Sequence, residues 1–420
     1  MSATPSDCPR YSPIQPSAPS PAPEQAVVLV GGRGSRLGGL TETTPKPLLQ
    51  VGDRPFLDHL LGEIARHGIA EIVLLCGYRA EALRARYAGA RINGARVRCL
   101  VEPEPLGTGG ALAFARREGV LGPEVFVFNG DSLFDVNLHD LALARAEAES
   151  AAVALRRVAD TGRYGHVAMD GTRITGWAEK TGDGPGAING GVYLLSTRAL
   201  DRLPGGASSL ERDLFPALAR EGRLAGRIYD GFFIDIGVPE DLARAQRAVP
   251  RALRRPIAFL DRDGTLNRDH GYVHTPAAFD WVSGAREAVK LLNDAGYRVA
   301  VVTNQAGVAR GYYPTGAVDA LHAWMQGQLI AAGAHLDAIA YCPHHPEGVV
   351  SGYACPCRCR KPGPGQIEAL LAAWPTDRGR CFLLGDRAGD LAAAAAAGVP
   401  GYLTDGRDLL ADVRAVLAAR

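Results

Sequence analysis

The chain has 420 residues, more than one hydrophobic core usually holds, so two or three domains are expected. Its net charge of +1, from 46 Lys and Arg against 45 Asp and Glu, gives no basic field of the kind that binds nucleic acid. No apolar stretch approaches the roughly 20 residues of a membrane span, and the N-terminus lacks a secretion signal. A cytoplasmic protein without a membrane partner is therefore expected.

The chain is predicted to divide into a tail, two domains and a linker. Residues 1–25 are rich in Pro, Ser and Ala with little to bury, which predicts a disordered tail. In residues 26–249, short apolar runs alternate with helix-like segments such as 56–67, and a second series of this kind fills residues 257–420. This alternation is typical of α/β domains with mostly parallel sheets. Residues 250–256, PRALRRP, have little to pack and indicate the linker.

A glycine-rich turn follows the first predicted strand of the domain at 26–249. Gly31, Gly32 and Gly34 would let backbone N–H groups approach phosphate oxygens, and Arg36 and Lys46 add two cations. This set favours a nucleoside triphosphate over a hydride-carrying dinucleotide, whose glycine motif has a different spacing. A tight connection without chemistry is the alternative for the glycines alone.

Two aspartates end buried strands of the same domain. Asp131 follows the run EVFVFNG, and Asp235 follows GFFI. Carboxylates at strand ends suit Mg²⁺, which takes one or two carboxylates together with substrate phosphates. Either aspartate taken alone could equally be a turn residue or a helix cap.

Several blocks of this domain, from Gly31 onward, resemble the sugar-1-phosphate nucleotidyltransferase family: GGRGSRL, PKPL, EPEPLGTGGAL, NGDSLFD, NGGVYLL and DIGVPEDLARA. The resemblance implies a Rossmann-like three-layer α/β/α domain that transfers a nucleotidyl group to a sugar 1-phosphate and releases pyrophosphate. The guanylyltransferases for mannose 1-phosphate and heptose 1-phosphate are the most similar branch, so GTP is the favoured nucleotide.

The same resemblance implies roles for individual residues of this domain. The nucleotide would be bound by Gly31, Gly32, Gly34, Gly107, Thr108 and Gly109. Arg36 and Lys46 would hold the triphosphate, and Asp131 and Asp235 would carry Mg²⁺. The sugar-phosphate pocket would be lined by Gly165, Glu179, Lys180 and Asn189.

In the domain at 257–420, Asp261 and Asp263 lie two residues apart directly after an apolar strand. If the strand geometry persists through both, they share a face and could divide the work of nucleophile and general acid–base. A lone D-x-D pair is common in loops. The function is favoured by Thr303 after the next strand, Lys361 before a helix, and the run GDRAGD after a later strand.

This order of residues resembles the haloacid dehalogenase superfamily of phosphatases over residues 257–403. The resemblance implies a second Rossmann-like α/β/α domain in which Asp261 is the nucleophile and Asp263 the general acid and base. Thr303 and Lys361 would bind the transferring phosphoryl group. Mg²⁺ would be held by Asp261, Asp386 and the Asp263 carbonyl. The intervals between the motifs leave too few residues for a separate cap domain.

A C-x-H pair and a C-x-C pair lie between Thr303 and Lys361. Clustered cysteines in a reducing compartment bind metal more often than they form disulfides. Cys342, His344, Cys357 and Cys359 form a closed tetrahedral ligand set for a structural Zn²⁺, with chance surface cysteines as the alternative. Cys355 and Cys357 are also a C-x-C pair, and the choice of Cys357 with Cys359 rests on the C-x-C-R-K-P register of zinc-bearing heptose bisphosphate phosphatases.

Within the superfamily, the heptose 1,7-bisphosphate 7-phosphatases are the most similar through DRDGTLNRDHGYVH, TNQAGVARG, CPHHPEG and CRCRKPGPG. By this resemblance Asp390 would orient Lys361 or the metal. Besides Thr303 and Lys361, the residues implied to contact substrate are Asp269, His270, Gly271, Tyr272, Asn304, Gln305, Ala306 and Arg360.

The two resemblances together predict a bifunctional enzyme of nucleotide-activated heptose biosynthesis for surface polysaccharide. The phosphatase would convert heptose 1,7-bisphosphate into heptose 1-phosphate, which the first domain would join to a nucleotide from GTP. Histidinol-phosphate phosphatases share most of the motifs, and mannose 1-phosphate or another hexose 1-phosphate could be the sugar. A further alternative is that one domain is inactive and serves as a nucleotide-sugar sensor.

Overall fold

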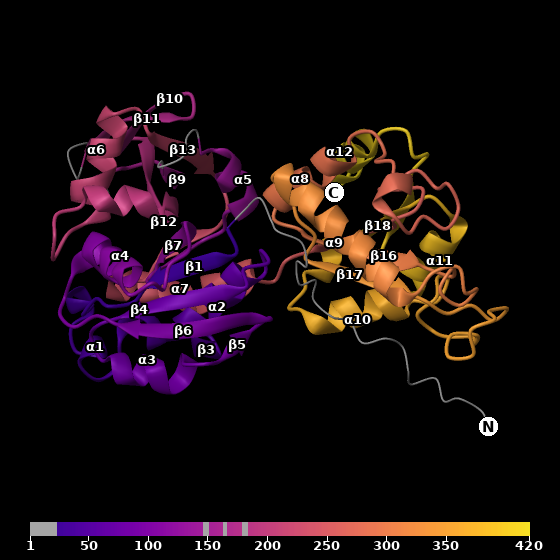
Figure 1. Ribbon diagram of the computed structural model, residues 1–420, viewed down its shortest axis with the longest axis horizontal. Helices are drawn as coiled ribbons and strands as arrows, with labels where there is room; N and C mark the ends of the chain where they lie inside the picture. Colours follow the sequence, from indigo (N-terminus) through magenta and orange to yellow (C-terminus); the bar gives the residue numbers. More distant parts are fainter. Residues whose placement is uncertain (1–22, 146–150, 163–165, 179–183) are drawn as a thin grey trace. The chain divides into compact units, whose positions relative to one another are not determined.

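The computed structural model describes residues 23–145, 151–162, 166–178 and 184–420. They form two compact units, one ending at Ala252 and the other running from Leu253 to Arg420 (Figure 1). Residues 1–22 of the expected tail at 1–25 lie outside the described residues, whereas its last residue, Gln25, belongs to the first strand, so the tail was predicted to end too late. Gly165, Glu179 and Lys180, three of the four residues expected in the sugar-phosphate pocket, also lie outside the described residues.

The unit ending at Ala252 is built on a ten-stranded mixed sheet. Its strands are β1 (Gln25–Leu29), β4 (Glu71–Cys76), β5 (Arg91–Ile92), β6 (Ala95–Val101), β7 (Glu124–Asn129), β9 (Ala151–Val158), β10 (His166–Asp170), β11 (Arg173–Ala178), β12 (Gly186–Ser196) and β13 (Leu224–Tyr229). They lie in the order β10-β11-β13-β9-β12-β7-β1-β4-β6-β5. Strands β7, β1, β4 and β6 are parallel, whereas β12 is antiparallel to both of its neighbours. The expected parallel arrangement thus holds for the half that carries the glycine-rich turn and not for the whole sheet.

Helices cover both faces of this sheet because alternate residues of the central strands point to opposite sides. Ala26 and Val28 pack with one set of helices, and Val27 packs with the other. The first set is α2 (Phe56–Ala65), α3 (Ala80–Tyr87) and α5 (Leu138–Leu143). The second set is α4 (Gly107–Arg117) and α6 (Phe215–Arg220). The three-layer α/β/α architecture predicted from the sequence is confirmed.

The remaining elements of this unit lie outside the ten-stranded sheet. They are η1 (Ser35–Leu37), α1 (Leu40–Thr43), η2 (Lys46–Leu48), β2 (Gln50–Val51), β3 (Arg54–Pro55), β8 (Ser132–Phe134), η3 (Thr197–Arg202), η4 (Leu210–Leu214), β14 (Phe233–Asp235) and α7 (Pro239–Ala252). The Gln246 side chain on α7 donates to the Gln50 carbonyl and accepts from the Gly52 N–H, so the helix is fixed to the β2–β3 hairpin. Because α7 continues through Pro250 to Ala252, the first three residues of the expected linker are helical.

The unit from Leu253 onward has a five-stranded sheet that is parallel throughout. Its strands are β15 (Ile257–Leu260), β16 (Arg298–Asn304), β17 (Ala338–Cys342), β18 (Phe382–Gly385) and β19 (Gly401–Leu403), in the order β17-β16-β15-β18-β19. One face packs on α8 (Ala285–Asp294), α9 (Thr315–Ala331) and α12 (Leu409–Ala418), and the other on α10 (Gly365–Ala373) and α11 (Ala388–Ala396). Two short 3₁₀ turns, η5 (Pro276–Ala278) and η6 (Arg378–Arg380), complete it.

The second unit agrees with the prediction of a domain without a cap. Within residues 253–420, all of which are described, the connections after β15 and β16 contain helices and loops and no inserted sheet. The carboxyl ends of β15, β16 and β18 therefore meet at one open edge, the usual place for a ligand in a parallel sheet.

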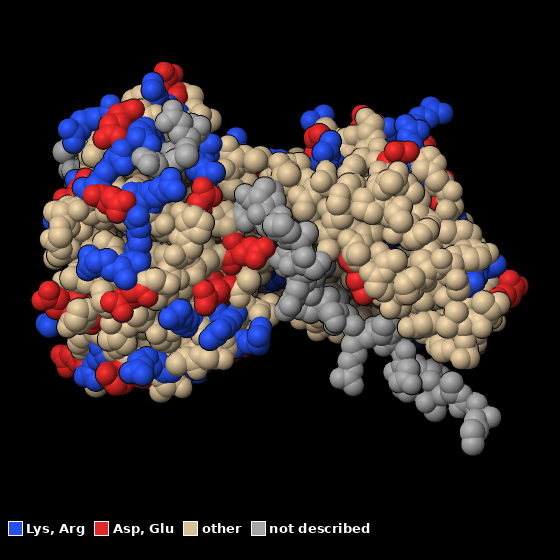
Figure 2. Space-filling model, in the orientation of Figure 1, with Lys and Arg blue, Asp and Glu red and all other residues tan. Residues whose placement is uncertain are grey.

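The described surface carries mixed charge, and its helices are not of the membrane-spanning kind. Lys and Arg lie interspersed with Asp and Glu over the unit that ends at Ala252 (Figure 2). Among the described residues, every helix is too short or too polar to cross a bilayer.

Candidate active sites

The first candidate site is a cavity of about 680 Å³ at the carboxyl ends of β1, β4 and β7. Its lining includes eight of the residues expected to bind the nucleotide, the triphosphate or the metal: Gly31, Gly32, Gly34, Arg36, Lys46, Gly107, Thr108 and Asp131. A cavity of this size accommodates a ligand of the size of a nucleotide. The sequence motifs, which lie far apart in the chain, are thus gathered around one space, including Gly237 of the DIGVPEDLARA motif.

Two glycines of the turn after β1 are required by the local geometry. A Cβ at Gly31 would lie 2.3 Å from Glu102 Oε1, so a larger residue would displace that carboxylate. Gly34 has a φ of +64°, which side chains with a Cβ rarely adopt. A Cβ at Gly32 would meet no atom within 4 Å, so this position opens onto the cavity.

Two carboxylates and two cations converge at one end of the cavity. The buried Lys46 Nζ lies 2.6 Å from Asp131 Oδ2 and 4.0 Å from Asp235 Oδ1. The two aspartates come together because β14 pairs with β8, which aligns Asp235 with Ser132. Burial and then the nearby Asp131 raise the pKa of Asp235. Arg36 is close by, since a Cβ at Gly237 would lie 3.2 Å from its guanidinium.

This end of the cavity suits a divalent cation. Two carboxylates share one lysine, and burial together with the neighbouring Asp131 raises the pKa of Asp235, so the ionised form of this carboxyl group is disfavoured without a further cation. A cation with oxygen ligands would relieve this charge.

Gly109 lies apart from the other expected nucleotide-binding residues. Its N–H donates to the Ser208 carbonyl at 2.9 Å, and a Cβ would lie 3.0 Å from the Leu203 and Ser208 side chains. It is not among the cavity-lining residues of the described chain. The glycine therefore permits close packing of α4 against the loop at 203–208.

Asn189 also lies outside the cavity lining but is linked to it by hydrogen bonds. Its side-chain amide donates to Tyr193 Oη at 2.8 Å, and that hydroxyl donates to Glu211 Oε1 at 3.1 Å. Glu211 accepts in turn from Thr108 Oγ1 at 2.9 Å. Asn189 is thereby joined to the start of α4.

Glu102 is a lining residue that sequence reasoning left without a role. Its carboxylate lies between the backbones of Gly31 and Gly77 and accepts from the Leu106 N–H at 3.2 Å. Burial raises the pKa of this carboxyl group. The only signal in the sequence is its position at the head of the EPEPLGTGGAL block.

The second candidate site lies at the carboxyl ends of β15, β16 and β18. Asp261, the first residue after β15, is buried, and its Oδ1 lies 2.8 Å from Lys361 Nζ. The same lysine lies 2.6 Å from Asp390 Oδ1, so one cation joins two carboxylates. Burial raises the pKa of Asp261 to about 6, while Lys361 opposes the rise and Asp390 adds to it.

Asp386 completes a group of three carboxylates whose oxygens lie within 4.8 Å of one another: Asp261, Asp386 and Asp390. Burial raises the pKa of Asp386, and its buried Oδ1 has no hydrogen-bond partner among the described residues. Three carboxylates beside one lysine leave an excess of buried negative charge. Hard oxygen ligands in this arrangement fit a magnesium-type cation.

Asp263 is held by a polar network that includes a residue missed in the sequence. Arg262 is fully buried, and its guanidinium contacts Asp263 Oδ2 at 2.9 Å. Asn267 Nδ2 donates to Oδ1 at 3.1 Å, and Gln305 Nε2 donates to Oδ2 at 3.0 Å. The arginine also lies 3.2 Å from His322 Nε2, and burial followed by this positive charge lowers the pKa of His322.

Thr303 and Lys361 are positioned by three neighbouring side chains. Thr303 Oγ1 accepts from Gln305, and its backbone exchanges hydrogen bonds with the Gln366 amide. The Asn304 side chain accepts from the Lys361 N–H and donates to its carbonyl, both at 3.0 Å. The expected phosphoryl-binding pair is thus held by Asn304 at the end of β16, by Gln305 directly after it and by Gln366 of α10.

The segment expected to contact substrate, 269–272, lies exposed at the rim of this site. Asp269 Oδ2 lies 2.6 Å from Arg387, whose Nε lies 3.5 Å from Asp386. His270 Nε2 lies 2.6 Å from Asp280 Oδ2. Gly271 and Tyr272 form a turn with positive φ, at +78° and +55°.

The remaining expected contacts are also near this edge. Ala306 follows Gln305, and its carbonyl accepts from the Arg310 N–H at 3.0 Å. Arg360 NH1 donates to the His344 carbonyl at 3.4 Å.

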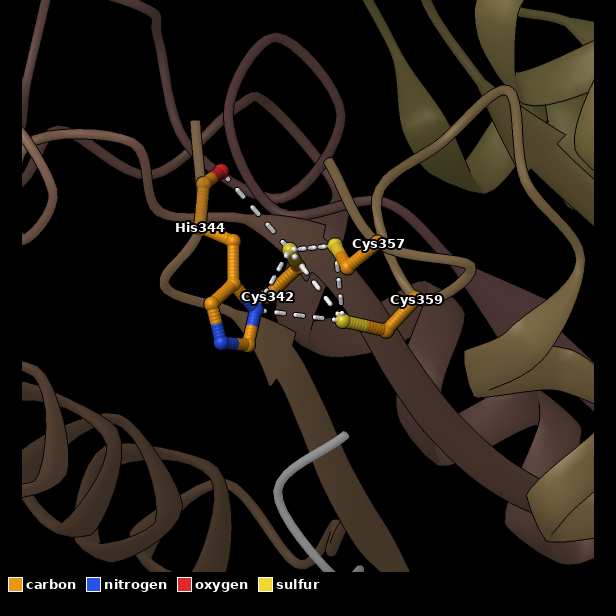
Figure 3. Close-up of side chains that lie close together, drawn as sticks. All are labelled: Cys342, His344, Cys357 and Cys359. Carbon is orange, nitrogen blue, oxygen red and sulfur yellow. Dashed lines mark hydrogen bonds between the residues drawn. The ribbon is translucent and has the colours of Figure 1, made fainter. Parts of the chain in front are cut away.

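Cys342, His344, Cys357 and Cys359 lie together beside this site, with their side chains pointing toward a common centre (Figure 3). The three sulfurs are 3.2 to 3.4 Å apart, and His344 Nδ1 lies 3.7 Å from Cys342 Sγ and 3.5 Å from Cys359 Sγ. These distances exceed a disulfide bond of about 2 Å and approach the roughly 3.8 Å edge of a tetrahedral zinc–thiolate site. Cys355 is not in this group.

The cluster is joined to the catalytic edge by the backbone. The Cys342 carbonyl accepts from the Gln305 N–H at 2.7 Å, and the Cys359 carbonyl accepts from Gln366 at 2.8 Å. Since Gln366 also holds Thr303, the cluster and the phosphoryl-binding residues share supports.

Two family models match the chain. The nucleotidyl transferase model matches residues 25–252, and the HAD-hydrolase-like model matches residues 358–414. Members of both families use metal ions and act on small molecules, in agreement with the two carboxylate groups described above.

Each of the two units is similar to proteins of known name. The D-glycero-β-D-manno-heptose-1,7-bisphosphate 7-phosphatase of Rhodopseudomonas palustris is 48% identical over 166 residues, which are 40% of this chain and 92% of the relative. The mannose-1-phosphate guanylyltransferase of Mycobacterium tuberculosis is 36% identical over 259 residues, which are 60% of this chain and 72% of the relative. The crystal structure of HddC from Yersinia pseudotuberculosis aligns with 53% of this chain and 97% of its own, at 29% identity and a TM-score of 0.48.

The resemblances inferred from the motifs are therefore confirmed at the level of family and enzyme class. The chain belongs to the nucleotidyl transferase family and carries, in its second unit, a phosphatase domain of the haloacid dehalogenase type.

Proposed function

We propose that the protein makes a nucleotide-activated heptose in two steps. The domain at 257–420 removes the 7-phosphate of D-glycero-D-manno-heptose 1,7-bisphosphate. The domain at 26–249 then transfers GMP from GTP to the resulting heptose 1-phosphate and releases pyrophosphate.

One observation supports this proposal. A single chain contains one part similar to a heptose-bisphosphate phosphatase and another part similar to a sugar-1-phosphate guanylyltransferase. The product of the first reaction is a sugar 1-phosphate, the chemical class that the second reaction consumes. A histidinol-phosphate phosphatase would have no evident use for the nucleotidyltransferase domain.

In the phosphatase reaction, an Asp261 oxygen attacks the phosphorus of the 7-phosphate. The bond from phosphorus to the C7 oxygen breaks, and Asp263 donates a proton to the leaving alcohol. Asp263 then removes a proton from water, which attacks the aspartyl phosphate and regenerates Asp261. Lys361 and Thr303 bind the phosphoryl oxygens, and Asp390 orients the lysine at 2.6 Å.

In the nucleotidyl transfer, a phosphate oxygen of the sugar 1-phosphate attacks the α-phosphorus of GTP, and the bond to the pyrophosphate group breaks. Arg36 and Lys46 offset the charge of the triphosphate, and the glycine turn at 31–34 lets the backbone approach it. Gly165, Glu179, Lys180 and Asn189 are the proposed sugar-phosphate contacts.

Magnesium is the proposed cation of both sites. It would be held by Asp131 and Asp235 in one, and by Asp261, Asp386 and the Asp263 carbonyl in the other. When bound, Mg²⁺ neutralises phosphate charge and helps to align the reacting groups.

The proposal is tested by incubating the protein with each anomer of heptose 1,7-bisphosphate, GTP and Mg²⁺. We expect free phosphate, pyrophosphate and a GDP-heptose identified by mass spectrometry and NMR. Omission of GTP should leave phosphate release intact. Phosphate release without any nucleotide sugar would contradict the coupled function.

A second candidate for the transferred sugar is mannose 1-phosphate, because the relative from Mycobacterium tuberculosis is named for it. Mannose 1-phosphate and heptose 1-phosphate differ by the carbon beyond C6. Comparing kcat/KM for the two with GTP separates the candidates, and a preference for mannose 1-phosphate would contradict the heptose assignment.

We further propose that Cys342, His344, Cys357 and Cys359 hold a structural Zn²⁺, since this set leaves no open coordination position. Cys359→Ser should reduce bound zinc from one per chain to nearly none, as measured by elemental analysis. It should also lower kcat for phosphate release by about tenfold or more, because Lys361 lies two residues on and Gln366 holds both segments.

Cys355→Ser is the matched control, since it changes a cysteine of the same loop that lies outside the cluster. It should keep full zinc content and phosphatase activity. Loss of zinc from the Cys355 variant, or its retention in the Cys359 variant, would contradict the proposed ligand set.

A further inference from the structure

Two tyrosines lie exposed and in contact at the rim of the phosphatase site. Tyr272 is 44% exposed and Tyr312 is 57% exposed, and their ring centroids are 4.7 Å apart at an interplanar angle of 85°. They come from the two loops that follow Asp263 and Thr303. Large aromatic side chains that meet at a surface mark a binding region more often than single exposed residues do.

A second aromatic contact links the same two loops and connects them to the catalytic residues. The rings of His274 and Tyr313 stack at 4.5 Å and 15°. Tyr313 Oη donates to Gln305 Oε1 at 3.1 Å, and Gln305 donates to both Asp263 and Thr303. The loops that carry Tyr272 and Tyr312 are therefore connected, through His274 and Tyr313, to the hydrogen bonds around Asp263 and Thr303.

Both loops have a residue with positive φ at or next to the exposed tyrosine. Tyr272 has a φ of +55°, an uncommon conformation for a residue with a side chain. Tyr312 follows Gly311, whose φ is +74°, and the Tyr312 N–H donates to the Gly307 carbonyl at 2.9 Å. An exposed tyrosine in a left-handed turn gains no core packing, which favours a role in binding.

The segment that carries Tyr312 is also supported by the cysteine-rich loop. The N–H groups of Val349 and Val350 both donate to the Ala309 carbonyl, at 2.8 and 3.0 Å. The position of Tyr312 is thus determined from two sides, by Gln305 through its neighbour Tyr313 and by the loop at 343–358.

We propose that Tyr312, paired with Tyr272, is a specificity-determining residue of the phosphatase. Its side chain binds the sugar carbons that are remote from the transferred phosphoryl group. The inference rests on the proposed function and extends it. This domain has no cap to enclose a substrate. The part of the substrate beyond the phosphoryl group must therefore be contacted by residues of the surrounding loops. A tyrosine offers a flat apolar face to sugar C–H groups and a hydroxyl to sugar oxygens.

The test compares a phosphosugar with a phosphoryl donor that has no sugar. Heptose 1,7-bisphosphate and acetyl phosphate are hydrolysed by the full chain, by Tyr312→Ala and by Tyr312→Phe. For Tyr312→Ala we expect KM for the bisphosphate to rise about tenfold with kcat little changed, whereas kcat/KM for acetyl phosphate changes less than about twofold. Tyr312→Phe, which keeps the ring, should recover most of the affinity for the bisphosphate.

Asp294→Asn is the control, because this side chain lies in a surface ion pair with Lys290 on α8 and its replacement should affect neither substrate. An equal fall of kcat/KM for both substrates in Tyr312→Ala would indicate a structural role and overturn the inference. An unchanged KM for the bisphosphate would overturn it as well.

Failure of the proposed function can be distinguished from failure of the Tyr312 inference. If the unmodified protein hydrolyses acetyl phosphate and not heptose 1,7-bisphosphate, the heptose assignment falls. The Tyr312 comparison is then made with the phosphosugar from a panel that is hydrolysed best. If no phosphosugar is hydrolysed, the inference falls too.

Discussion

Asp261→Asn is expected to lower phosphate release by at least about 10⁴-fold, since it removes the proposed nucleophile while keeping the shape of the side chain. Asp261 is buried and has Lys361 Nζ 2.8 Å from its Oδ1. The amide cannot form the aspartyl phosphate. The measurement is initial-rate phosphate release from heptose 1,7-bisphosphate. Pyrophosphate release from heptose 1-phosphate and GTP by the same preparation should be unchanged.

Asp294→Asn provides a matched control on the same unit. Asp294 is exposed on α8 in a surface ion pair with Lys290, and such pairs contribute little. Its phosphatase activity should stay within about twofold of the unmodified protein. A fully active Asp261→Asn protein would show that another group is the nucleophile, whatever the result with the control.

The catalytic edge of the second unit could be anticipated because its residues follow strands. Asp261 directly follows β15, Thr303 is the second-last residue of β16, and Asp386 directly follows β18. Parallel strands direct their carboxyl ends to one edge, so an apolar run followed by a carboxylate is informative. The structure brings these residues together, with Lys361 between Asp261 and Asp390.

The residues that support this edge were beyond sequence reasoning. Arg262 stands between the two aspartates, and a charged residue next to a catalytic motif is ordinarily exposed. It is fully buried because Asp263, His322 and the Val273 carbonyl surround its guanidinium. Gln366 lies in a helix without any motif, and only the fold brings its amide to Thr303.

The first unit shows a different limit. Apolar composition does not reveal strand direction, and β12 is antiparallel to β7 and β9 although the alternating pattern predicts mostly parallel strands. Similarly, Gly107 and Gly109 belong to one motif and both lie close to Ser208, yet of the two Gly107 alone also lines the described cavity. A motif shows that glycines are needed. It does not show whether a given glycine is needed for close approach of a ligand or for close packing within the protein.

Lys46→Ala is expected to lower kcat/KM for nucleotidyl transfer by at least about 10³-fold. Lys46 is buried, and it is the cation that the two aspartates of the site share, at 2.6 Å from Asp131 and 4.0 Å from Asp235. Its loss should raise the pKa of Asp235 further, because the lysine is the largest of the influences that oppose burial and Asp131, ahead of the Gly237 N–H and Arg36. The assay is pyrophosphate release from GTP and the preferred sugar 1-phosphate.

The kinetic pattern distinguishes a triphosphate-binding lysine from one that merely balances charge. If Lys46 holds the triphosphate, KM for GTP should rise while KM for the sugar 1-phosphate changes little, and added Mg²⁺ should not restore the rate. If it only balances the two aspartates, excess Mg²⁺ should substitute for it and recover most of the activity. Arg54→Ala, which breaks an exposed pair with Asp53 in the same unit, should behave as the unmodified protein. Phosphate release depends on the other unit and should persist in Lys46→Ala, and an unchanged KM for the sugar 1-phosphate shows that the unit carrying Lys46 has itself folded.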